Sequence, residues 1–186
     1  MTDCAWNNPN EDMQALQRSR RGRINKLEGE AFERIIETAC RWYREQGTAE
    51  IEKTPEPIKQ LGAKNRNGQF KACYQKRAQP DFKGTIDGGM SVVFEAKHTE
   101  SDRIAQSVIS QEQWDRLEAH NRLGADAFVL VALRLEDFYR VPWTTWRNMK
   151  TIYGYKHMKK EDLEEFRISN KNGILRFLEA PEDCES

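Results

Sequence analysis

Long apolar runs are missing from this sequence. Of its 186 residues, 38% are hydrophobic and 32% are charged, and no hydrophobic run approaches the roughly 20 residues that a membrane-spanning helix needs. The arginines among the first thirty residues have no apolar stretch beside them, which argues against a secretory signal. We therefore predict a cytoplasmic protein, and its length is that of one domain.

Cysteine is scarce as well. The cysteines are far apart, and none belongs to a Cys-x-x-Cys pair or has a nearby histidine partner for a zinc site. We expect neither a disulfide framework nor a cysteine-based zinc site. The thiols predicted to be reduced are Cys4, Cys40, Cys73 and Cys184.

Net charge is absent too, because 30 basic and 30 acidic residues cancel. The charges are nevertheless segregated along the chain. Segments 13–27 and 57–80 carry basic residues and no acid, whereas 161–186 holds eight acids against three basic residues. Local basic segments are typical of proteins that bind polyanions, although each can also be an ordinary solvated face.

The second basic segment has the composition of a projecting arm. Between about residues 59 and 74, glycine and asparagine interrupt the basic residues and hinder regular structure, and Phe70 and Tyr74 can stack on bases. A disordered loop is the alternative. The predicted DNA-binding residues of the two basic segments are Lys59, Lys64, Arg66, Lys71, Lys76, Arg77, Arg21 and Arg23.

The apolar pattern predicts one α/β domain at residues 25–180. Residues 1–24 show no apolar period and are expected to form a flexible basic segment, and 181–186 an acidic tail. Asn25 and Glu28 have the spacing of a capping box for a helix that runs to Gly47.

Later elements complete the predicted fold. They are an extended segment at 49–57, a hairpin turning at 87–89, a strand at 91–97, a helix between Ser110 and Gly124 with Ser110 and Gln113 as its cap, strands at 127–133 and 138–141, a short helix after Pro142, and a turn at 170–173 between two short strands. The uninterrupted apolar run at 127–133 is typical of a central strand covered on both faces. This order predicts a mixed central β-sheet flanked by helices.

Alternation along the strand 91–97 places Glu95 and Lys97 on one face, opposite Phe94. In the hairpin, Asp81 on the preceding strand can lie opposite the Glu95 region. Converging carboxylates favour a divalent cation, and oxygen ligands select Mg²⁺ or Mn²⁺ over zinc. A lysine beside the ion can orient or deprotonate a water, so the pattern predicts metal-assisted phosphodiester hydrolysis. Spacing alone is weak evidence, since Glu-x-Lys also occurs as a solubility feature of exposed strands.

Sequence motifs strengthen this prediction. Pro80-Asp81, followed fourteen positions later by Glu95-Ala-Lys97, resembles the signature of the PD-(D/E)XK nucleases. Four further motifs resemble the RecU family of Holliday junction resolvases: Gly29-x-x-x-Glu33, Lys53-Thr-Pro-Glu-Pro57, Phe94-Glu-Ala-Lys97 and Gln113 in the helix after Ser110. The resemblance covers about residues 25–142. It departs at Pro80, where the family has threonine, which leaves the role of a hydroxyl there unfilled.

The resemblance implies a restriction-endonuclease-like core with a protruding basic arm, and it assigns roles to five residues. Asp81 and Glu95 become metal-binding carboxylates, and Lys97 orients water or stabilises charge. Glu33 would hold a metal or its water, and Gln113 would contact the reacting phosphate or its water. As alternatives, Glu33 is a solvated helix acid and Gln113 is only a capping residue.

The function implied by the resemblance is a Mg²⁺-dependent endodeoxyribonuclease, with Mn²⁺ as a substitute, that resolves four-way DNA junctions in recombination and repair. It also implies a homodimer, because paired cuts in a two-fold junction need two sites related by a two-fold axis. The alternatives are another PD-(D/E)XK repair or restriction-type nuclease, or a non-catalytic protein that binds branched DNA. His98, beside the motif, is interpreted as a surface residue or a further base.

Overall fold

The computed structural model describes residues 9–55, 58–74 and 79–179. Its centre is a five-stranded sheet in the order β1-β4-β5-β7-β8. The strands are β1 (Ala49–Lys53), β4 (Phe82–Ile86), β5 (Ser91–Thr99), β7 (Asp126–Leu133) and β8 (Asp137–Pro142). Strands β5 and β7 are parallel and the other neighbours are antiparallel.

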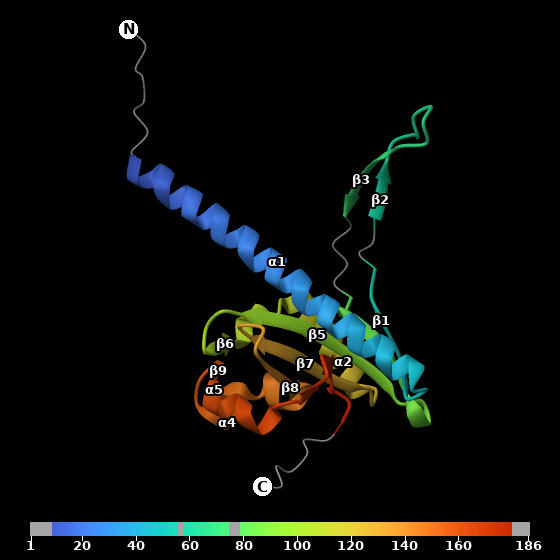
Figure 1. The fold of residues 1–186 in the computed structure, drawn as a ribbon, viewed down its shortest axis with the longest axis vertical. Coiled ribbons are helices and arrows are strands. Elements are labelled where there is room, and N and C mark those ends of the chain that lie inside the picture. Colours follow the sequence, from blue (N-terminus) through green and yellow to red (C-terminus); the bar gives the residue numbers. More distant parts are fainter. Residues whose placement is uncertain (1–8, 56–57, 75–78, 180–186) are drawn as a thin grey trace.

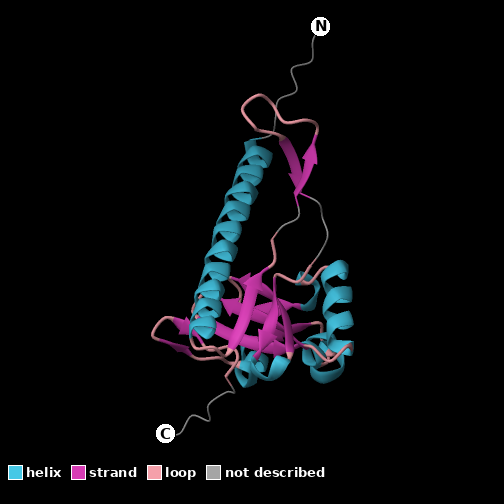
Figure 2. Ribbon diagram, turned by 90° about the vertical axis from the view of Figure 1, so that its right-hand side faces the viewer, coloured by secondary structure: helices cyan, strands magenta, loops and turns pink. Residues whose placement is uncertain are grey.

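Helices cover both faces of this sheet (Figures 1 and 2). The long α1 (Pro9–Glu45) packs on one face, and α2 (Gln111–Arg122) and α3 (Trp143–Arg147) pack on the other. The predicted α/β class and mixed central sheet are therefore confirmed. Within the described residues, no helix has both the length and the apolarity needed to cross a membrane.

The remaining elements are short. They are β2 (Ile58–Leu61), β3 (Lys71–Tyr74), β6 (Arg103–Ala105), α4 (Met149–Tyr153), β9 (His157–Lys159), α5 (Lys160–Leu163), β10 (Asn170–Lys171), β11 (Ile174–Leu175) and the 3₁₀ turns η1 (Asp87–Gly89), η2 (Gln106–Val108) and η3 (Glu164–Phe166). The predicted turn at 170–173 does join two short strands, β10 and β11.

Two apolar cores lie on the two faces of the sheet, because side chains alternate along β5 and β7. On the α1 face, Phe82, Phe94 and Phe128 stack across three adjacent strands, with ring centroids 5.0 and 4.6 Å apart. On the other face, Val93 and Val129 pack in a second core with the residues of α2 and α3. The central position predicted for residues 127–133 is confirmed, since all seven are buried.

Gly84 permits the close approach of the edge strand β1 to its neighbour β4. A Cβ at this position of β4 would lie 2.1 Å from the carbonyl oxygen of Glu50 in β1, a distance that no side chain tolerates. Glycine is therefore required for β1 to pair with β4 beside the β4–β5 hairpin.

The predicted start of the first helix is wrong: α1 begins at Pro9 rather than at Asn25. Only the part from Phe32 onward packs in the core, and the preceding turns project beyond the sheet (Figure 1). Met13, Leu16 and Leu27 are more than half exposed there. A projecting helix has no buried face to impose an apolar period, and the glutamines, arginines and leucines of this segment have high intrinsic helix propensity.

The predicted arm is a β-hairpin rather than a segment without regular structure. Strands β2 and β3 pair from Ile58↔Tyr74 to Leu61↔Lys71, and the hairpin extends away from the sheet (Figures 1 and 2). At its tip, the Asn65 side chain accepts hydrogen bonds from the N–H groups of Asn67 and Gln69. The Asn and Gly residues that suggested irregular structure therefore build the turn of a two-stranded ribbon.

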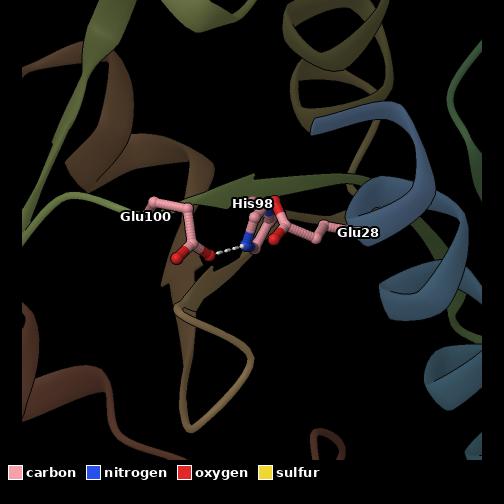
Figure 3. A group of neighbouring side chains, drawn as sticks. All are labelled: Glu28, His98 and Glu100. Atoms are coloured by element: carbon pink, nitrogen blue, oxygen red, sulfur yellow. Dashed lines mark hydrogen bonds and ion pairs between the residues drawn. The ribbon is translucent and has the colours of Figure 1, made fainter. Parts of the chain in front are cut away.

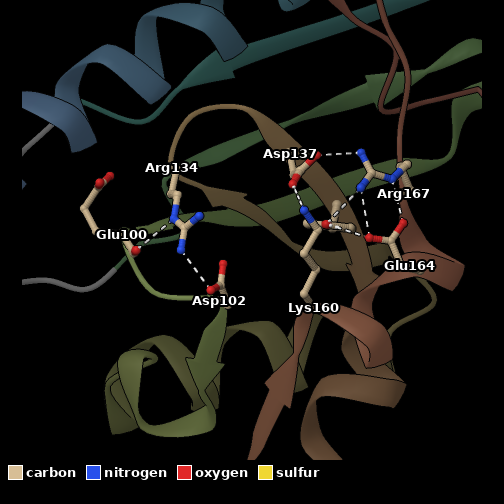
Figure 4. A network of polar contacts seen from close by, with 8 residues as sticks. Glu100, Asp102, Arg134, Asp137, Lys160, Glu164 and Arg167 are labelled. Atoms are coloured by element: carbon tan, nitrogen blue, oxygen red, sulfur yellow. Dashed lines mark hydrogen bonds and ion pairs between the residues drawn. The ribbon is translucent and has the colours of Figure 1, made fainter.

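Charged residues attach the last elements to the sheet (Figure 4). Asp137, at the start of β8, forms salt bridges with Lys160 of α5 and with Arg167, the latter at 2.8 Å. Arg167 also forms a salt bridge of 2.7 Å with Glu164 of η3. On the neighbouring turn, Arg134 pairs with Asp102 at 2.8 Å. These contacts hold the segment after β5 and the C-terminal elements against one end of the sheet.

Candidate nuclease site

The β4–β5 hairpin brings Asp81 next to Glu95 and Lys97. Asp81 lies just before β4, and the pairing Phe82↔Phe94 sets its side chain beside the middle of β5. The carboxylate of Asp81 accepts a hydrogen bond of 3.0 Å from the N–H of Ala96. The geometry expected from the hairpin and the alternation is thus present in the structure.

Lys97 lies between the two carboxylates. Its Nζ is 3.1 Å from Oε2 of Glu95 and 3.6 Å from Oδ2 of Asp81. The lysine side chain is 18% exposed and that of Asp81 is 27% exposed, whereas Glu95 is fully buried. The site therefore opens to solvent through Asp81 and Lys97 and is closed behind Glu95.

The environment of Glu95 disfavours its charged form. Burial and then the nearby charge of Asp81 raise the pKa of Glu95 to about 8, although Lys97 opposes this shift. Its Oε1 atom is buried and has no hydrogen-bond partner among the residues that the structure describes. A free carboxylate oxygen beside a second carboxylate suits a hard divalent cation, so Asp81 and Glu95 fit the predicted metal site.

Gln113 joins helix α2 to this site. Its Oε1 accepts the N–H of Ser110 at 3.1 Å, and its own N–H donates to Oγ of Ser110 at 3.3 Å, which completes the predicted capping box. Its Nε2 donates to Oε2 of Glu95. The capping interpretation of Gln113 is therefore confirmed, and the cap turns the amide nitrogen toward the carboxylate of Glu95, whereas the predicted contact with the phosphate or its water stays a prediction.

Glu33 is not in contact with these four residues. Its carboxylate pairs with Lys53 Nζ at 2.7 Å, and Lys53 lies opposite Phe82 in the β1–β4 register. The next residue, Thr54, donates its N–H to the carbonyl oxygen of Asp81 at 2.8 Å. The sequence alone assigns no role to the motif from Lys53 to Pro57, and in the structure its first two residues connect Glu33 and β1 to the Asp81 end of the sheet.

The predicted DNA-binding residues fall on two projecting elements. Arg21 and Arg23 are exposed on α1, and Lys64 and Arg66 are exposed at the tip of the β2–β3 hairpin. Lys59 and Lys71 belong to strands β2 and β3, whereas Lys76 and Arg77 lie outside the described residues. Both elements extend from the same end of the sheet domain (Figures 1 and 2).

Because the pKa of Glu95 is raised, we expect the metal-free protein to become less stable as the pH rises. Between about pH 4.5 and 8, folded Glu95 keeps a proton that the unfolded chain releases, so rising pH favours unfolding across this window. We expect the free energy of unfolding of wild type, measured by urea titration in EDTA, to decline across this window relative to that of Glu95→Gln. Parallel pH profiles of the two proteins would contradict the assigned environment of Glu95.

Comparison with known proteins supplies a family match. The family model of Recombination protein U (RecU) matches residues 27–182. No curated protein sequence matches the chain significantly. Among solved structures, the chain is similar to Archaeoglobus fulgidus Hjc, a Holliday junction resolvase from an archaeal hyperthermophile, with a TM-score of 0.42 and 15% sequence identity over 63% of this chain and 75% of that chain.

Proposed function

Because the chain belongs to the Recombination protein U (RecU) family, we propose that it is a metal-dependent endodeoxyribonuclease that resolves four-way DNA junctions. The observation that carries this proposal is that Asp81, Lys97 and the buried Glu95 lie together beside strands β4 and β5, where Asp81 and Lys97 are open to solvent. A protein that only binds branched DNA has no use for a buried carboxylate with an unpaired oxygen next to a second acid.

We assign the chemistry of the site to the four grouped residues. Asp81 and Glu95 would hold a divalent ion, with Mg²⁺ as the proposed ion and Mn²⁺ as a substitute, and such an ion would polarise the phosphate and lower the pKa of a bound water. Lys97 places its ammonium group where it can hold the attacking water or neutralise charge that develops on the phosphate. Gln113 fixes Oε2 of Glu95 by its hydrogen bond, so Oε1 is the oxygen that would be available to an ion.

The resemblance gives Glu33 the role of holding a metal or its water, whereas in the structure it pairs with Lys53. Its salt bridge to Lys53 connects the first helix to β1 at the Asp81 end of the sheet. We propose that Glu33 contributes to the site when DNA and metal are bound, by exchanging Lys53 for a metal-bound water. The alternative, an acid that only anchors α1 to β1, predicts that Glu33→Gln lowers stability without lowering the cleavage rate of the folded protein.

The test of the proposed function compares several DNA structures. Labelled four-way junction, flap, nicked and linear duplexes are incubated with Mg²⁺, Mn²⁺ or EDTA, and the products are separated on denaturing gels. We expect metal-dependent paired cuts in the junction only. Preferential cutting of nicked or linear duplex would favour another repair or restriction-type nuclease, and binding without cutting in either metal would favour a non-catalytic protein.

Lys97→Arg separates a specific role of the lysine from a general electrostatic one. Arginine keeps the positive charge, but its planar guanidinium is larger and cannot give up a proton near neutral pH. We expect the single-turnover cleavage rate to fall by about 10²-fold or more with unchanged junction affinity. The matched control is Lys83→Arg on the exposed face of β4, which should cut normally. Full activity of Lys97→Arg would leave the lysine only a charge-balancing role.

Dimer formation is proposed from the symmetry of the substrate. One chain carries one site, whereas two related cuts in a junction need two sites about a two-fold axis. We expect sedimentation equilibrium at micromolar concentration to give about twice the 21.8 kDa mass of the chain. A monomer that still makes paired, symmetric cuts would contradict this prediction. The cytoplasmic location expected from the sequence stays a prediction.

A further inference from the structure

A second group of metal-ligand side chains lies on the face of β5 opposite Glu95 and Lys97. It consists of Glu28 from α1, His98 from β5 and Glu100 from the turn after β5 (Figure 3). One donor atom of each residue lies within 4.8 Å of the others. We propose that these residues bind a divalent transition-metal ion, with Zn²⁺ as the best match, at a site separate from the nuclease centre. This inference does not depend on the proposed function.

The contacts of His98 leave one side of its ring open to a ligand. Its side chain is only 6% exposed, so the surface position expected from the sequence is wrong. Nε2 lies 3.0 Å from Oε1 of Glu100, which fixes the orientation of the ring. Nδ1 lies 3.9 Å from Oε2 of Glu28, beyond hydrogen-bonding distance. The ring is therefore held in place by one carboxylate while it faces the other without a bond.

Glu28 gives an independent indication. Its Oε2 atom is buried and has no hydrogen-bond partner in the described part of the chain. A buried carboxylate oxygen without a donor is unfavourable unless it is protonated or bound to a cation. Since this oxygen faces the imidazole of His98, a cation between them would satisfy both groups.

The donor set selects the kind of ion. One imidazole nitrogen and two carboxylate oxygens suit Zn²⁺, Co²⁺ or Mn²⁺, whereas Mg²⁺ prefers oxygen ligands alone. Binding at the usual distance of about 2.0–2.2 Å requires the donors to approach one another slightly. Glu100 can move in this way, because its side chain is 51% exposed and can exchange its hydrogen bond with Nε2 of His98 for the ion. A cavity of about 300 Å³, lined by His98, Glu100 and Asn25 among others, has room for water to complete the coordination.

The backbone that carries the third ligand, Glu100, is held in place by its neighbours. Arg134 donates to the carbonyl oxygen of Glu100 at 3.3 Å and pairs with Asp102 at 2.8 Å (Figure 4). The backbone at Glu100 is thus anchored while its side chain stays free to adjust. An ion bound here would join α1 to the end of β5 just before α1 leaves the sheet, and would hold the projecting basic half of the helix in one direction.

Metal titration of a variant without the nuclease carboxylate tests this proposal. In an Asp81→Asn background, Co²⁺ and Zn²⁺ are titrated by calorimetry, and the absorption of bound Co²⁺ distinguishes nitrogen and oxygen ligands from cysteine thiolates. We expect one bound equivalent without thiolate bands, and a rise in Tm on adding Zn²⁺. Adding His98→Gln should weaken binding by about 10- to 100-fold and remove most of the rise in Tm.

Two further variants keep the result interpretable. His120→Gln on α2, remote from the cluster in sequence and element, serves as the matched control and should bind the metal normally. Glu100→Gln alters an exposed side chain and should also weaken binding, so it replaces His98→Gln if that variant fails to fold. Equal titrations for the His98→Gln and His120→Gln proteins, or a Co²⁺ spectrum with thiolate bands, would overturn the proposal.

Discussion

Glu95→Ala is expected to reduce cleavage of a four-way junction by about 10³-fold or more, while the protein stays folded and still binds the junction. The substitution removes one of the two carboxylates proposed to hold the metal ion. It also removes a buried acid whose charged form is disfavoured by burial and by Asp81, so the change relieves repulsion as well as leaving a small cavity. DNA affinity should persist because the basic residues lie on α1 and the hairpin.

The measurement combines single-turnover cleavage in Mg²⁺ with junction binding in Ca²⁺ or EDTA and a circular dichroism melt. Asp81→Ala should behave in the same way, since both carboxylates contribute to one site. Glu136→Ala, an exposed acid in the turn after β7, is the matched control and should cut normally. Near wild-type cleavage by both site variants would exclude the assigned site, and loss of folding in both would favour a structural role.

Replacement of the arm by a short Gly-Ser bridge between Lys59 and Tyr74 is expected to weaken junction binding far more than duplex binding. The hairpin carries four basic residues between these positions and extends away from the sheet, where it can enter the open centre of a junction. A linear duplex has no such opening. If about four phosphate contacts are lost, the slope of log affinity against log salt concentration should become shallower by roughly 3 to 4 units.

Charge and shape can be separated in the same experiment. Lys64→Gln with Arg66→Gln removes two charges from the exposed tip but keeps the hairpin, so its salt slope should change by roughly 2 units. Fluorescence anisotropy with junction and duplex at several salt concentrations gives both slopes. Equal losses on the two DNAs would reduce the arm to a general electrostatic tether, and no loss on either would remove it from recognition.

The geometry of the candidate nuclease site was predictable because its signals are local. Strand alternation is enough to place Glu95 and Lys97 on one face, and a tight hairpin is enough to bring Asp81 beside them. The cap of α2 is likewise encoded within four residues, from Ser110 to Gln113. In each case the prediction depended on neighbours in sequence or on one turn.

The sequence did not predict contacts between segments that are far apart in the chain. It also did not predict the part of α1 that packs against almost nothing in the described part of the chain. The pairing of Lys53 with Glu33 and the low exposure of the His98 side chain beside α1 were not predicted, because they depend on how a distant helix lies on the sheet, which no local period encodes. The first turns of α1 were missed for the opposite reason, since a helix without a buried face has no apolar period to detect. The hairpin was missed because its turn residues also suit irregular loops.

The two side-chain hydrogen bonds of Gln113 limit which residues this position can accept. Glutamate is an equally good partner in a capping box, but at position 113 it would direct a third carboxylate at Glu95 and Asp81. Shorter amides would lose either the helix cap or the bond to Glu95. Neither glutamate nor a shorter amide can therefore replace Gln113 without loss. A homologue with another residue at this position is expected to differ both in the cap of its second helix and in the acidic site.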